Sequence, residues 1–307
     1  MNYLTRASAK HFFLCLLALL LGREAFANES QALATKAIPM RIVSLAPSVT
    51  ETLFALGFGN RVVGVTTYCD YPVAALRLPK IGGFTNPSLE AIVAQRPDLV
   101  IGVNDSSHPV KAREMERLGI KVALIAVTNV NEILNSIKSV ARLLGSPKAG
   151  ERLVQKITLQ FDEVKKRVAP APRRATLLVV GLRPLVAVGG KNFIDELITL
   201  AGGENIAGNA AQPWLNLPDE YVVAKAPQVI IEAGMGSERG QIARHWGDLK
   251  SIPAVKEHRV YAYPSDKILR PGPRIGEGLE EIARLVHPEC FADSKGGLNK
   301  GSGCEGS

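Results

Sequence analysis

The sequence predicts an α/β fold of two lobes that are joined by one long connecting α-helix. Three observations support this prediction: short β-branched runs alternate with helical ones from Arg41 onward, one long helical run lies near mid-chain, and a short pattern recurs on both sides of it. Such alternation is typical of parallel sheets covered by helices. We expect a first lobe over residues 41–146, a connecting helix over 147–169 and a second lobe over 170–292.

Local patterns place the elements of each lobe. In the first lobe the expected strands are 42–45, 62–65, 99–103 and 122–127, and the expected helices are 89–94, 110–118 and 130–144. In the second lobe we expect a strand at 176–180 and helices at 193–201 and 275–286. Ser48 and Glu51 have the spacing of a capping box, in which each side chain accepts from the other's backbone amide. This predicts that a helix begins there.

The connecting helix is predicted from the run between Pro147 and Val168. Proline suits a first helical turn, and no further proline follows within the run. Its apolar residues recur every three or four positions: Ala149, Leu153, Ile157, Phe161, Val164 and Val168. At about 1.5 Å per residue the run makes a rod of roughly 33 Å, long enough to reach from one lobe to the other. The alternative is a long core helix within a single domain.

An internal repeat favours two related lobes. Residues 88–103 (SLEAIVAQRPDLVIGV) match residues 218–233 (PDEYVVAKAPQVIIEA) at a constant offset of 130, and each copy is typical of a helix, a proline turn and a buried strand. The matched pairs include Glu90/Glu220, Val93/Val223 and Pro97/Pro227. A habit shared by many helix–turn–strand units is the alternative explanation. The position of the copies on either side of the long helix favours duplication.

The N-terminus predicts export. Basic Arg6 and Lys10 precede a short apolar stretch, and Ala25-Phe26-Ala27 has the small-x-small pattern of a cleavage site. We therefore expect residues 1–27 to be a cleaved signal peptide, residues 28–40 to be an N-terminal extension, and the mature protein to be periplasmic. A membrane anchor is the alternative, but the apolar stretch is short for a span.

The remaining composition excludes several classes of function. The formal net charge of +8 is spread along the chain without a basic block, so no nucleic-acid footprint is present. Cys69, Cys290 and Cys304 survive processing, and an odd number leaves at least one unpaired, with a Cys69–Cys290 bridge open. The histidines have no short metal-ligand spacing, and the tail at 293–307 has the composition of a disordered segment. We expect no metal and no cofactor.

No catalytic motif is complete. The glycine-rich stretch 234–240 resembles a dinucleotide loop, but its third glycine is one position late. The sequence Gly189-Gly190-Lys191-Asn192 lacks both the earlier glycine and the Ser or Thr of a phosphate loop. No G-x-S-x-G or H-E-x-x-H pattern occurs. These observations favour a non-enzymatic binding protein, with an enzyme kept as the alternative.

Two segments carry a family resemblance. TTYCDYP at 66–72, followed by GGF at 82–84, resembles the first lobe of periplasmic cobalamin-binding proteins, and GGENIA at 202–207, followed by Pro213-Trp214, resembles their second lobe. VSLAPSVTE at 43–51 resembles the wider family of ABC-importer binding proteins for haem, siderophores and corrinoids. The resemblance extends over about residues 41–286 and implies the class III fold: two Rossmann-like lobes with one connecting helix.

The resemblance also implies a function. A protein of this kind captures a corrinoid, cobalamin or cobinamide, in the cleft between its lobes and delivers it as a monomer to an ABC importer whose permease is a dimer. Haem or a ferric siderophore is the alternative ligand, since Tyr68 is a candidate axial ligand. An enzyme on the same scaffold and a sensor that binds without transport are further alternatives.

Five ligand-binding residues follow from the resemblance. Tyr68 and Phe84 are expected on the first-lobe wall and Trp214 on the second, because aromatic faces cover the ring of a corrinoid. Asp266 and Arg270 match a second-lobe loop that approaches the ligand in relatives. Tyr68 as an ordinary strand-end aromatic, and a surface ion pair between Asp266 and Arg270, are the alternatives.

Two further features concern docking and stability. The resemblance implies that Glu90 and Glu220 dock onto the permease dimer, although both are also first-turn acids that the helix dipole favours. Positions that carry a disulfide in some relatives correspond to Ala201 and Ala283 here. We therefore expect the second lobe to depend for its stability on packing or on a different bridge.

Overall fold

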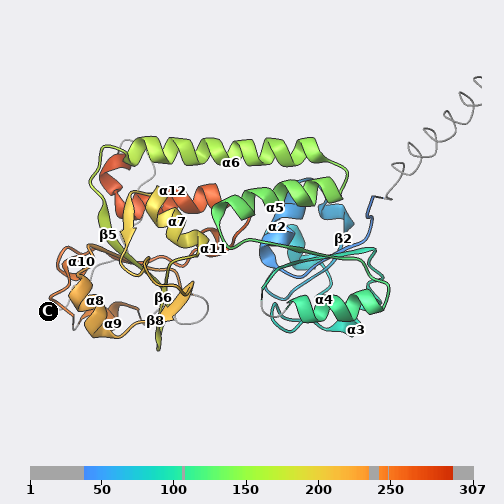
Figure 1. Cartoon of the computed structure of the whole chain (residues 1–307), viewed down its shortest axis with the longest axis horizontal. Helices are drawn as coiled ribbons and strands as arrows, with labels where there is room; N and C mark the ends of the chain where they lie inside the picture. The colour runs from blue at the N-terminus through green and yellow to red at the C-terminus, as the bar shows by residue number, and fades with distance from the viewer. Residues whose placement is uncertain (1–37, 106–107, 235–241, 248, 293–307) are drawn as a thin grey trace, which may run out of the picture. The chain divides into compact units, whose positions relative to one another are not determined.

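Two β-sheets, each covered by helices, make up the described part of the chain (Figure 1). The computed structural model describes residues 38–105, 108–234, 242–247 and 249–292. The predicted signal peptide, Cys304 and the predicted tail therefore lie outside the described residues. Residues from Met40 onward form one compact unit that contains both sheets. None of the described helices combines the length and apolarity that a membrane span requires.

The first sheet has four parallel strands in the order β2-β1-β3-β4. Its strands are β1 (Ile42–Ser44), β2 (Val62–Val65), β3 (Leu99–Val103) and β4 (Val122–Ile125). The helices around it are α2 (Pro47–Ala55), α3 (Leu89–Ala94), α4 (His108–Arg117) and α5 (Val130–Leu143). Every residue of β3 is buried, as expected for a central parallel strand covered on both faces.

The second sheet repeats this order around its own central strands. The parallel neighbours are β7 (Gly203–Asn205), β5 (Arg174–Leu182), β9 (Val229–Glu232) and β10 (Val260–Ala262). Two further strands, β6 (Leu185–Val188) and β8 (Trp214–Asn216), extend the edge of β5 in antiparallel pairing. Like β7 and β10, they were not predicted from the sequence. The helices are α7 (Phe193–Leu200), α8 (Asp219–Lys225), α9 (Ile242–Gly247), α10 (Pro253–Lys256), α11 (Asp266–Leu269) and α12 (Ile275–Val286).

The sequence repeat extends to backbone conformation. Arg96 and Ala226, which are 130 residues apart, both adopt left-handed backbone angles, with φ of 47° and 48°. Each directly precedes the proline of its copy, Pro97 or Pro227. Non-glycine residues rarely adopt this conformation, so its recurrence at matched positions favours two related lobes over a shared local habit.

Matched hydrogen bonds support the same conclusion. The Asp98 carboxylate accepts from the backbone N–H of Arg41 at 3.1 Å in the first lobe. At the matched position of the second lobe, the Gln228 side-chain oxygen accepts from the N–H of Ala175 at 3.0 Å. In both lobes this side chain satisfies the backbone where the first strand begins. The repeat therefore describes structure as well as sequence.

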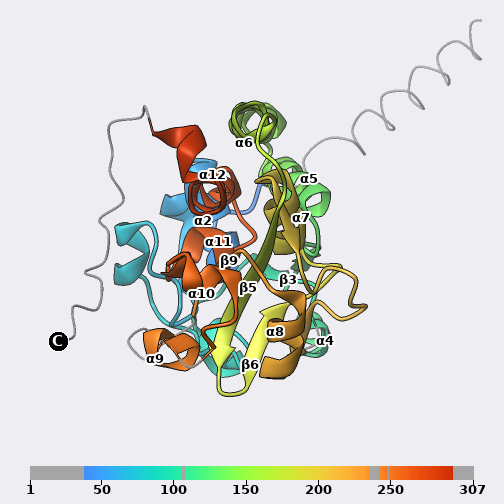
Figure 2. The same ribbon diagram turned by 90° about the vertical axis from the view of Figure 1, so that its left-hand side faces the viewer.

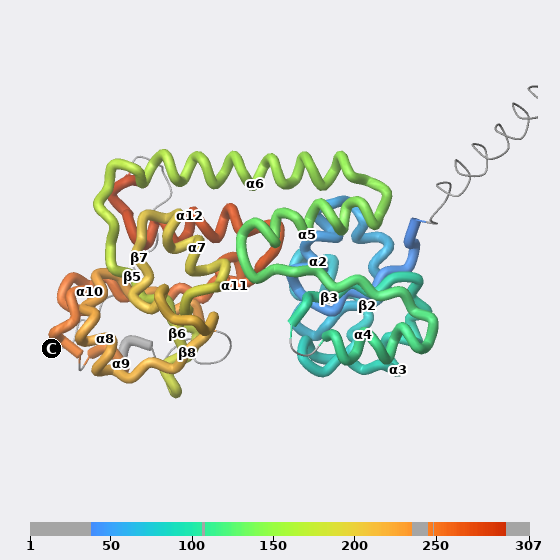
Figure 3. The backbone as a smooth tube through the Cα atoms, in the orientation of Figure 1, coloured from blue at the N-terminus to red at the C-terminus, as the bar shows by residue number. Residues whose placement is uncertain are grey.

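The long helix α6 (Pro147–Val168) begins where predicted and ends one residue before the predicted end at 169. It packs against α5 on the first-lobe side and against α7 and α12 on the second, and Figure 3 traces it past both groups of helices. Gly150 allows close packing on α5, because an added Cβ would lie 2.6 Å from the Cβ of Ala141. Seen nearly end-on in Figure 2, α6 lies beside α5 and α12. Helix α6 thus connects the lobes.

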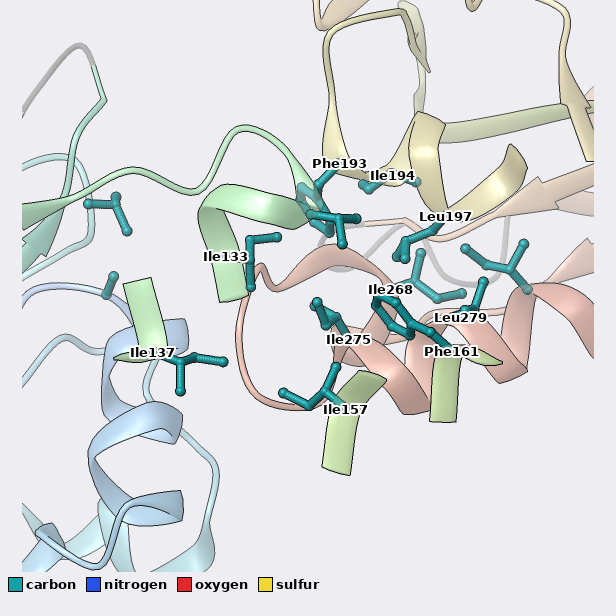
Figure 4. Packing of buried hydrophobic residues seen from close by; sticks show 14 of the residues in the cluster. Ile133, Ile137, Ile157, Phe161, Phe193, Ile194, Leu197, Ile268, Ile275 and Leu279 are labelled. Carbon is teal, nitrogen blue, oxygen red and sulfur yellow. The ribbon is translucent and has the colours of Figure 1, made fainter. Parts of the chain in front are cut away.

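A continuous apolar cluster joins the lobes beneath α6. Figure 4 shows its central members, which come from α5, α6, α7, α11 and α12: Ile133, Ile137, Ile157, Phe161, Phe193, Ile194, Leu197, Ile268, Ile275 and Leu279. All are buried. Fully burying one such side chain stabilises a protein by about 1.5–3 kcal/mol, so separating the lobes here would be costly. The lobes share one core and are not linked only by a hinge.

The predicted capping box at Ser48 and Glu51 was wrong. Helix α2 begins at Pro47 with Ala46 as its N-cap, and no side chain caps it. Proline needs no hydrogen-bond acceptor and suits the first helical turn, so the helix begins before Ser48 and places Ser48 inside it. The Glu51 carboxylate is buried and accepts hydrogen bonds from Arg270 and Arg274 of the second lobe.

Both described cysteines are free thiols, so the Cys69–Cys290 bridge that the sequence left open is not formed. Cys69 is buried between the hydroxyls of Thr50 and Thr66, at 3.2 and 3.1 Å from its sulfur. Ala201 and Ala283 are fully buried in the apolar cluster that joins the lobes. At the two positions that carry a disulfide in some relatives, this protein therefore has tightly packed alanines.

Candidate functional site

A cavity of about 1060 Å³ is lined by residues of both lobes. In the first lobe the lining comes from segments that follow β1, β2, β3 and β4, and in the second from segments that follow β6, β9 and β10. Ligands of open parallel sheets commonly bind at the carboxyl ends of the strands. The volume is at the upper end of small-molecule sites, so the cavity suits a bulky ligand.

Tyr68 forms part of the first-lobe wall. It lies in a turn after β2, which is closed by a hydrogen bond from the Cys69 N–H to the Thr66 carbonyl at 3.1 Å. Cys69 points into the core, and the Tyr68 side chain remains 62% exposed on the cavity lining. The N–H of Thr67 donates to the Gly82 carbonyl at 2.9 Å, which ties this turn to the segment that carries Phe84.

Phe84 is the second aromatic residue of this wall. Its ring meets the ring of His108 edge-on, with 5.0 Å between centroids and an interplanar angle of 71°. His108 is fully buried, and its Nδ1 lies 2.8 Å from the Asp105 carboxylate. The edge-on contact fixes the orientation of Phe84, which is partly buried and lines the cavity.

Trp214 provides the aromatic face of the second-lobe wall. It begins the edge strand β8, pairs with Val188 of β6 and is 41% exposed. The Pro213 carbonyl before it accepts hydrogen bonds from the Gly189 N–H at 3.0 Å and the Asn192 amide at 3.1 Å. A Cβ on Gly189 would lie 2.2 Å from the Gln212 carbonyl oxygen, so the loop requires glycine there. The incomplete phosphate-loop pattern is therefore structural support for Trp214.

Arg270 connects the two walls. Its Nη1 donates to Asp70 at 2.6 Å and to Glu51 at 3.1 Å, both in the first lobe. Its Nη2 pairs with Asp266 at 3.1 Å and donates to the Tyr68 carbonyl at 3.4 Å. The ion pair with Asp266 and the position on the cavity thus occur together, so the two interpretations offered from the sequence were not exclusive.

A second arginine completes the contact with Glu51. Arg274 donates to Glu51 at 2.8 Å from Nε and 2.6 Å from Nη2, and its guanidinium lies 4.0 Å from the centre of the Tyr71 ring. The Glu51 side chain is only 1% exposed. A charge this buried is tolerated only when it is paired and hydrogen-bonded. Arg270 and Arg274 meet both conditions for the Glu51 carboxylate.

These contacts perturb the acid–base properties of the site. The hydrogen bond from Arg270 lowers the pKa of Asp70 below its ordinary value. Burial alone would lower the pKa of Arg270, but hydrogen bonds to Asp70 and Glu51 outweigh burial and raise that pKa. The Asp70–Arg270 pair therefore remains ionised at any pH near neutrality.

The five residues predicted to bind ligand, Tyr68, Phe84, Trp214, Asp266 and Arg270, all line this cavity. Glu90 and Glu220 do not, and both are exposed in the first turns of α3 and α8.

Three cavity residues or supports were missed from the sequence. Asp70 belongs to the TTYCDYP segment that carried the resemblance, and its place next to Tyr68 was the available signal. Glu51 was interpreted as a helix cap, and Lys191 as part of a failed phosphate loop. The roles of Asp70 and Glu51 depend on contacts with Arg270, 200 and 219 positions away, which local patterns do not encode. Lys191 lines the cavity.

A separate cluster brings together potential metal ligands. Atoms of His287, Glu289 and Cys290 lie within 4.8 Å of one another. Glu289 already pairs with Arg174 at 3.0 Å, and Nε2 of His287 faces the Gly202 carbonyl at 3.2 Å. These contacts tie the end of α12 to the second sheet, which is a structural role.

Curated relatives resemble the chain over most of its length. It is 31% identical over 275 residues to the uncharacterized ABC transporter substrate-binding lipoprotein YvrC of Bacillus subtilis, covering 86% of this chain and 85% of the relative. It is 30% identical over 246 residues to the vitamin B12-binding protein of Salmonella paratyphi A, covering 80% of this chain and 90% of the relative.

Solved structures share the fold. The periplasmic vitamin B12-binding protein BtuF of Vibrio cholerae matches with a TM-score of 0.73 at 25% identity, over 82% of this chain and 98% of that one. The periplasmic heme-binding protein RhuT of Roseiflexus sp. RS-1 matches with a TM-score of 0.74 at 29% identity, over 81% and 98%. These likenesses agree with the predicted two-lobed class III fold. Because the family profile also matches residues 42–267, the chain belongs to the periplasmic binding protein family.

Proposed function

We propose that the protein captures a corrinoid, cobalamin or cobinamide, in the cavity between its lobes and delivers it to an ABC importer. The observation that carries this proposal is the combination of aromatic walls with a charge-compensated arginine in a cavity of about 1060 Å³. Tyr68, Phe84 and Trp214 offer faces to a broad, flat ligand. The relatives named vitamin B12-binding proteins support the same ligand.

The charges of the lining favour a corrinoid over haem. Haem carries two propionates, which require free cations or hydrogen-bond donors. Arg270 is compensated by Glu51, Asp70 and Asp266, and in the described lining Lys191 is the cationic side chain without a carboxylate partner. A corrinoid instead has a rim of neutral amides, which suits a lining rich in carboxylate oxygens.

Haem remains the second candidate because of Tyr68. Its side chain is exposed on the cavity, where a phenolic oxygen can reach a ligand's metal ion, and RhuT is named a heme-binding protein. Titration of the purified protein with cobalamin, cobinamide, haemin and a ferric siderophore separates the candidates. We expect the corrinoids to bind most tightly. Tight binding of haemin with no binding of corrinoids would contradict the proposal.

We further propose that the protein acts in the periplasm as a monomer, without a cofactor and without catalysing a reaction. The export pattern at residues 1–27 and the family of binding proteins support this. Terminal sequencing of the exported protein should find Asn28 as its first residue, and a bound corrinoid should be recovered chemically unchanged. An N-terminus at Met1, or a converted ligand, would contradict these points.

For delivery, we propose that Glu90 and Glu220 dock onto equivalent basic sites of a permease dimer. Both are exposed at matched positions, and Val93 and Val223, one turn further along the same helices, are exposed as well. A dimer with twofold symmetry presents each site twice. Related lobes with matched acidic and apolar groups suit such a partner.

A further inference from the structure

The hydrogens of Arg270 are mostly committed to the protein itself. Each terminal nitrogen of a guanidinium carries two hydrogens. Those of Nη1 have Asp70 and Glu51 as acceptors, and those of Nη2 have Asp266 and the Tyr68 carbonyl. Although Arg270 lines the cavity, its side chain is only 14% exposed. It therefore offers little to an anionic ligand.

The carboxylates around Arg270 differ in what they offer. Asp70 comes from the first lobe and Asp266 from the second, and their side chains are 53% and 45% exposed on the cavity lining. A carboxylate accepts about four hydrogen bonds, so both retain lone pairs after pairing with Arg270. Glu51, by contrast, is buried and does not line the cavity. A ligand meets hydrogen-bond acceptors from both lobes.

The balance of charge in this cluster is negative. Glu51, Asp70 and Asp266 contribute three negative charges, and Arg270 and Arg274 contribute two positive ones. Arg270 also lowers the pKa of Asp70, so that carboxylate stays ionised at mildly acidic pH. An amide N–H is attracted by this arrangement, whereas a ligand carboxylate placed there meets like charge.

We propose that Arg270 is a positioning residue that holds Asp70 and Asp266 as a pair of acceptors, one from each lobe, and that this pair makes the cavity select ligands with amide rims over ligands with carboxylate rims. The inference rests on the proposed function and deepens it, because it names the ligand groups that the polar part of the site recognises. Glu51, which is itself paired with Arg274, accepts a further hydrogen bond from Arg270.

The test compares cobalamin with derivatives in which one side-chain amide has been hydrolysed to a carboxylate. A set of derivatives, each altered at a different side chain, removes the need to know the ligand's orientation. We expect at least one acid to bind the parent protein roughly 10- to 100-fold more weakly than cobalamin, measured by calorimetry at pH 7. The two ligands share the same ring, so their affinity ratio isolates the polar site.

Variants then assign the selectivity. Asp70→Asn and Asp266→Asn should reduce that ratio, since a neutral amide tolerates a ligand carboxylate. Arg270→Lys keeps the charge but loses the planar fork, so it should also reduce the ratio if Arg270 positions the pair. Glu163→Gln on the exposed face of α6 removes one charge elsewhere and is the matched control. A merely structural role would weaken both ligands equally and leave the ratio unchanged.

The outcomes separate the two proposals. Equal affinity of the parent for cobalamin and all its acids would overturn the selectivity inference and leave corrinoid binding intact. If the folded parent binds no corrinoid, the proposed function fails, and haemin is compared with its diamide. A preference for the diamide would uphold the acceptor pair, and a preference for haemin would overturn it.

Discussion

Trp214 is presented to the cavity by its neighbours. Pro213 before it is held by two hydrogen bonds from the Gly189–Asn192 loop, and β8 pairs with β6 after it. The other tryptophan, Trp246, is buried against Glu232 in the second-lobe core. A fluorescence change on ligand binding should therefore come mainly from Trp214.

We expect Trp214→Ala to weaken corrinoid binding by roughly 5- to 150-fold, or about 1–3 kcal/mol, because a large stacking face is lost. Fluorescence quenching and calorimetry measure the change. Leu159→Ala, at an exposed position of α6, is the control and should bind like the parent. Unchanged affinity in Trp214→Ala would place the ligand elsewhere in the cavity.

Glu51 is a buried charge between two arginines of the other lobe. Glu51→Gln leaves both guanidinium groups short of a charged partner, and breaking such a buried pair costs about 3–5 kcal/mol. Urea denaturation should show this loss, whereas Glu163→Gln should change the free energy of unfolding by less than about 1 kcal/mol. Similar losses in the two variants would mean that the contact between the lobes contributes little.

Among the elements, strand β9 ends in a buried carboxyl group. Its last residue, Glu232, is buried, receives a hydrogen bond from the Trp246 indole and leaves one carboxylate oxygen without a partner in the described structure. Burial raises the pKa of Glu232 from 4.5 to about 7, and the bond from Trp246 opposes the rise. Ala233 and Gly234, the next two residues, line the cavity.

The raised pKa predicts a pH-dependent stability. Between about pH 4.5 and 7 the folded protein keeps a proton on Glu232 that the unfolded chain has lost. The contribution of the protonated, uncharged Glu232 to the free energy of unfolding is therefore fully present below pH 4.5 and is lost as the pH rises through 7. Relative to Glu232→Gln, the parent should lose on the order of 2–3 kcal/mol of unfolding free energy between pH 5 and 8. Parallel pH profiles for the two proteins would contradict the prediction.

For the whole molecule, the shared core is the feature that governs motion. Helix α6 contacts helices of both lobes, and the apolar cluster beneath it is continuous. The carboxylate of Glu196 in α7 also accepts from the N–H of Val130, at the start of α5, at 3.0 Å. Glu51 of the first lobe in turn accepts a hydrogen bond from Arg270 of the second. Each lobe therefore contributes one glutamate carboxylate to a hydrogen bond with the other lobe. We expect ligand binding to change the separation of the lobes only slightly.

The two docking glutamates give the prediction at this scale. Glu90→Ala with Glu220→Ala should leave ligand affinity and the fold nearly unchanged, because neither side chain lines the cavity. Binding to the permease and uptake should fall, and the remaining binding should depend less on salt, since long-range charge attraction is lost. Uptake equal to that of the parent at normal expression would contradict docking. The glutamates would then only stabilise their helices through the helix dipole, by about 0.3–1 kcal/mol each.

The short edge strands were not predictable in the same way as the central ones. β3 is a continuous apolar run, and β9 begins with three apolar residues. Both have turn signals beside them, so their patterns alone identify them. β8 has three residues, of which two are exposed, so its only strand signal is the pairing with β6. The site shows the same difference. Trp214 was predicted from the family resemblance, but the strand that presents it was not predicted.

The sequence by itself determined the alternation of strands and helices and the extent of α6, and its internal repeat indicated two related lobes. These features are carried by neighbouring residues or by a repeat along the chain, so no knowledge of long-range contacts is needed. The aromatic residues of the cavity were predicted from the family resemblance. Only the tertiary structure decided that Glu51 bonds across the lobes, that Asp70 and Asp266 meet at Arg270, and that the two cysteines stay apart. Each depends on a distance between residues remote in the chain, and packing alone sets that distance.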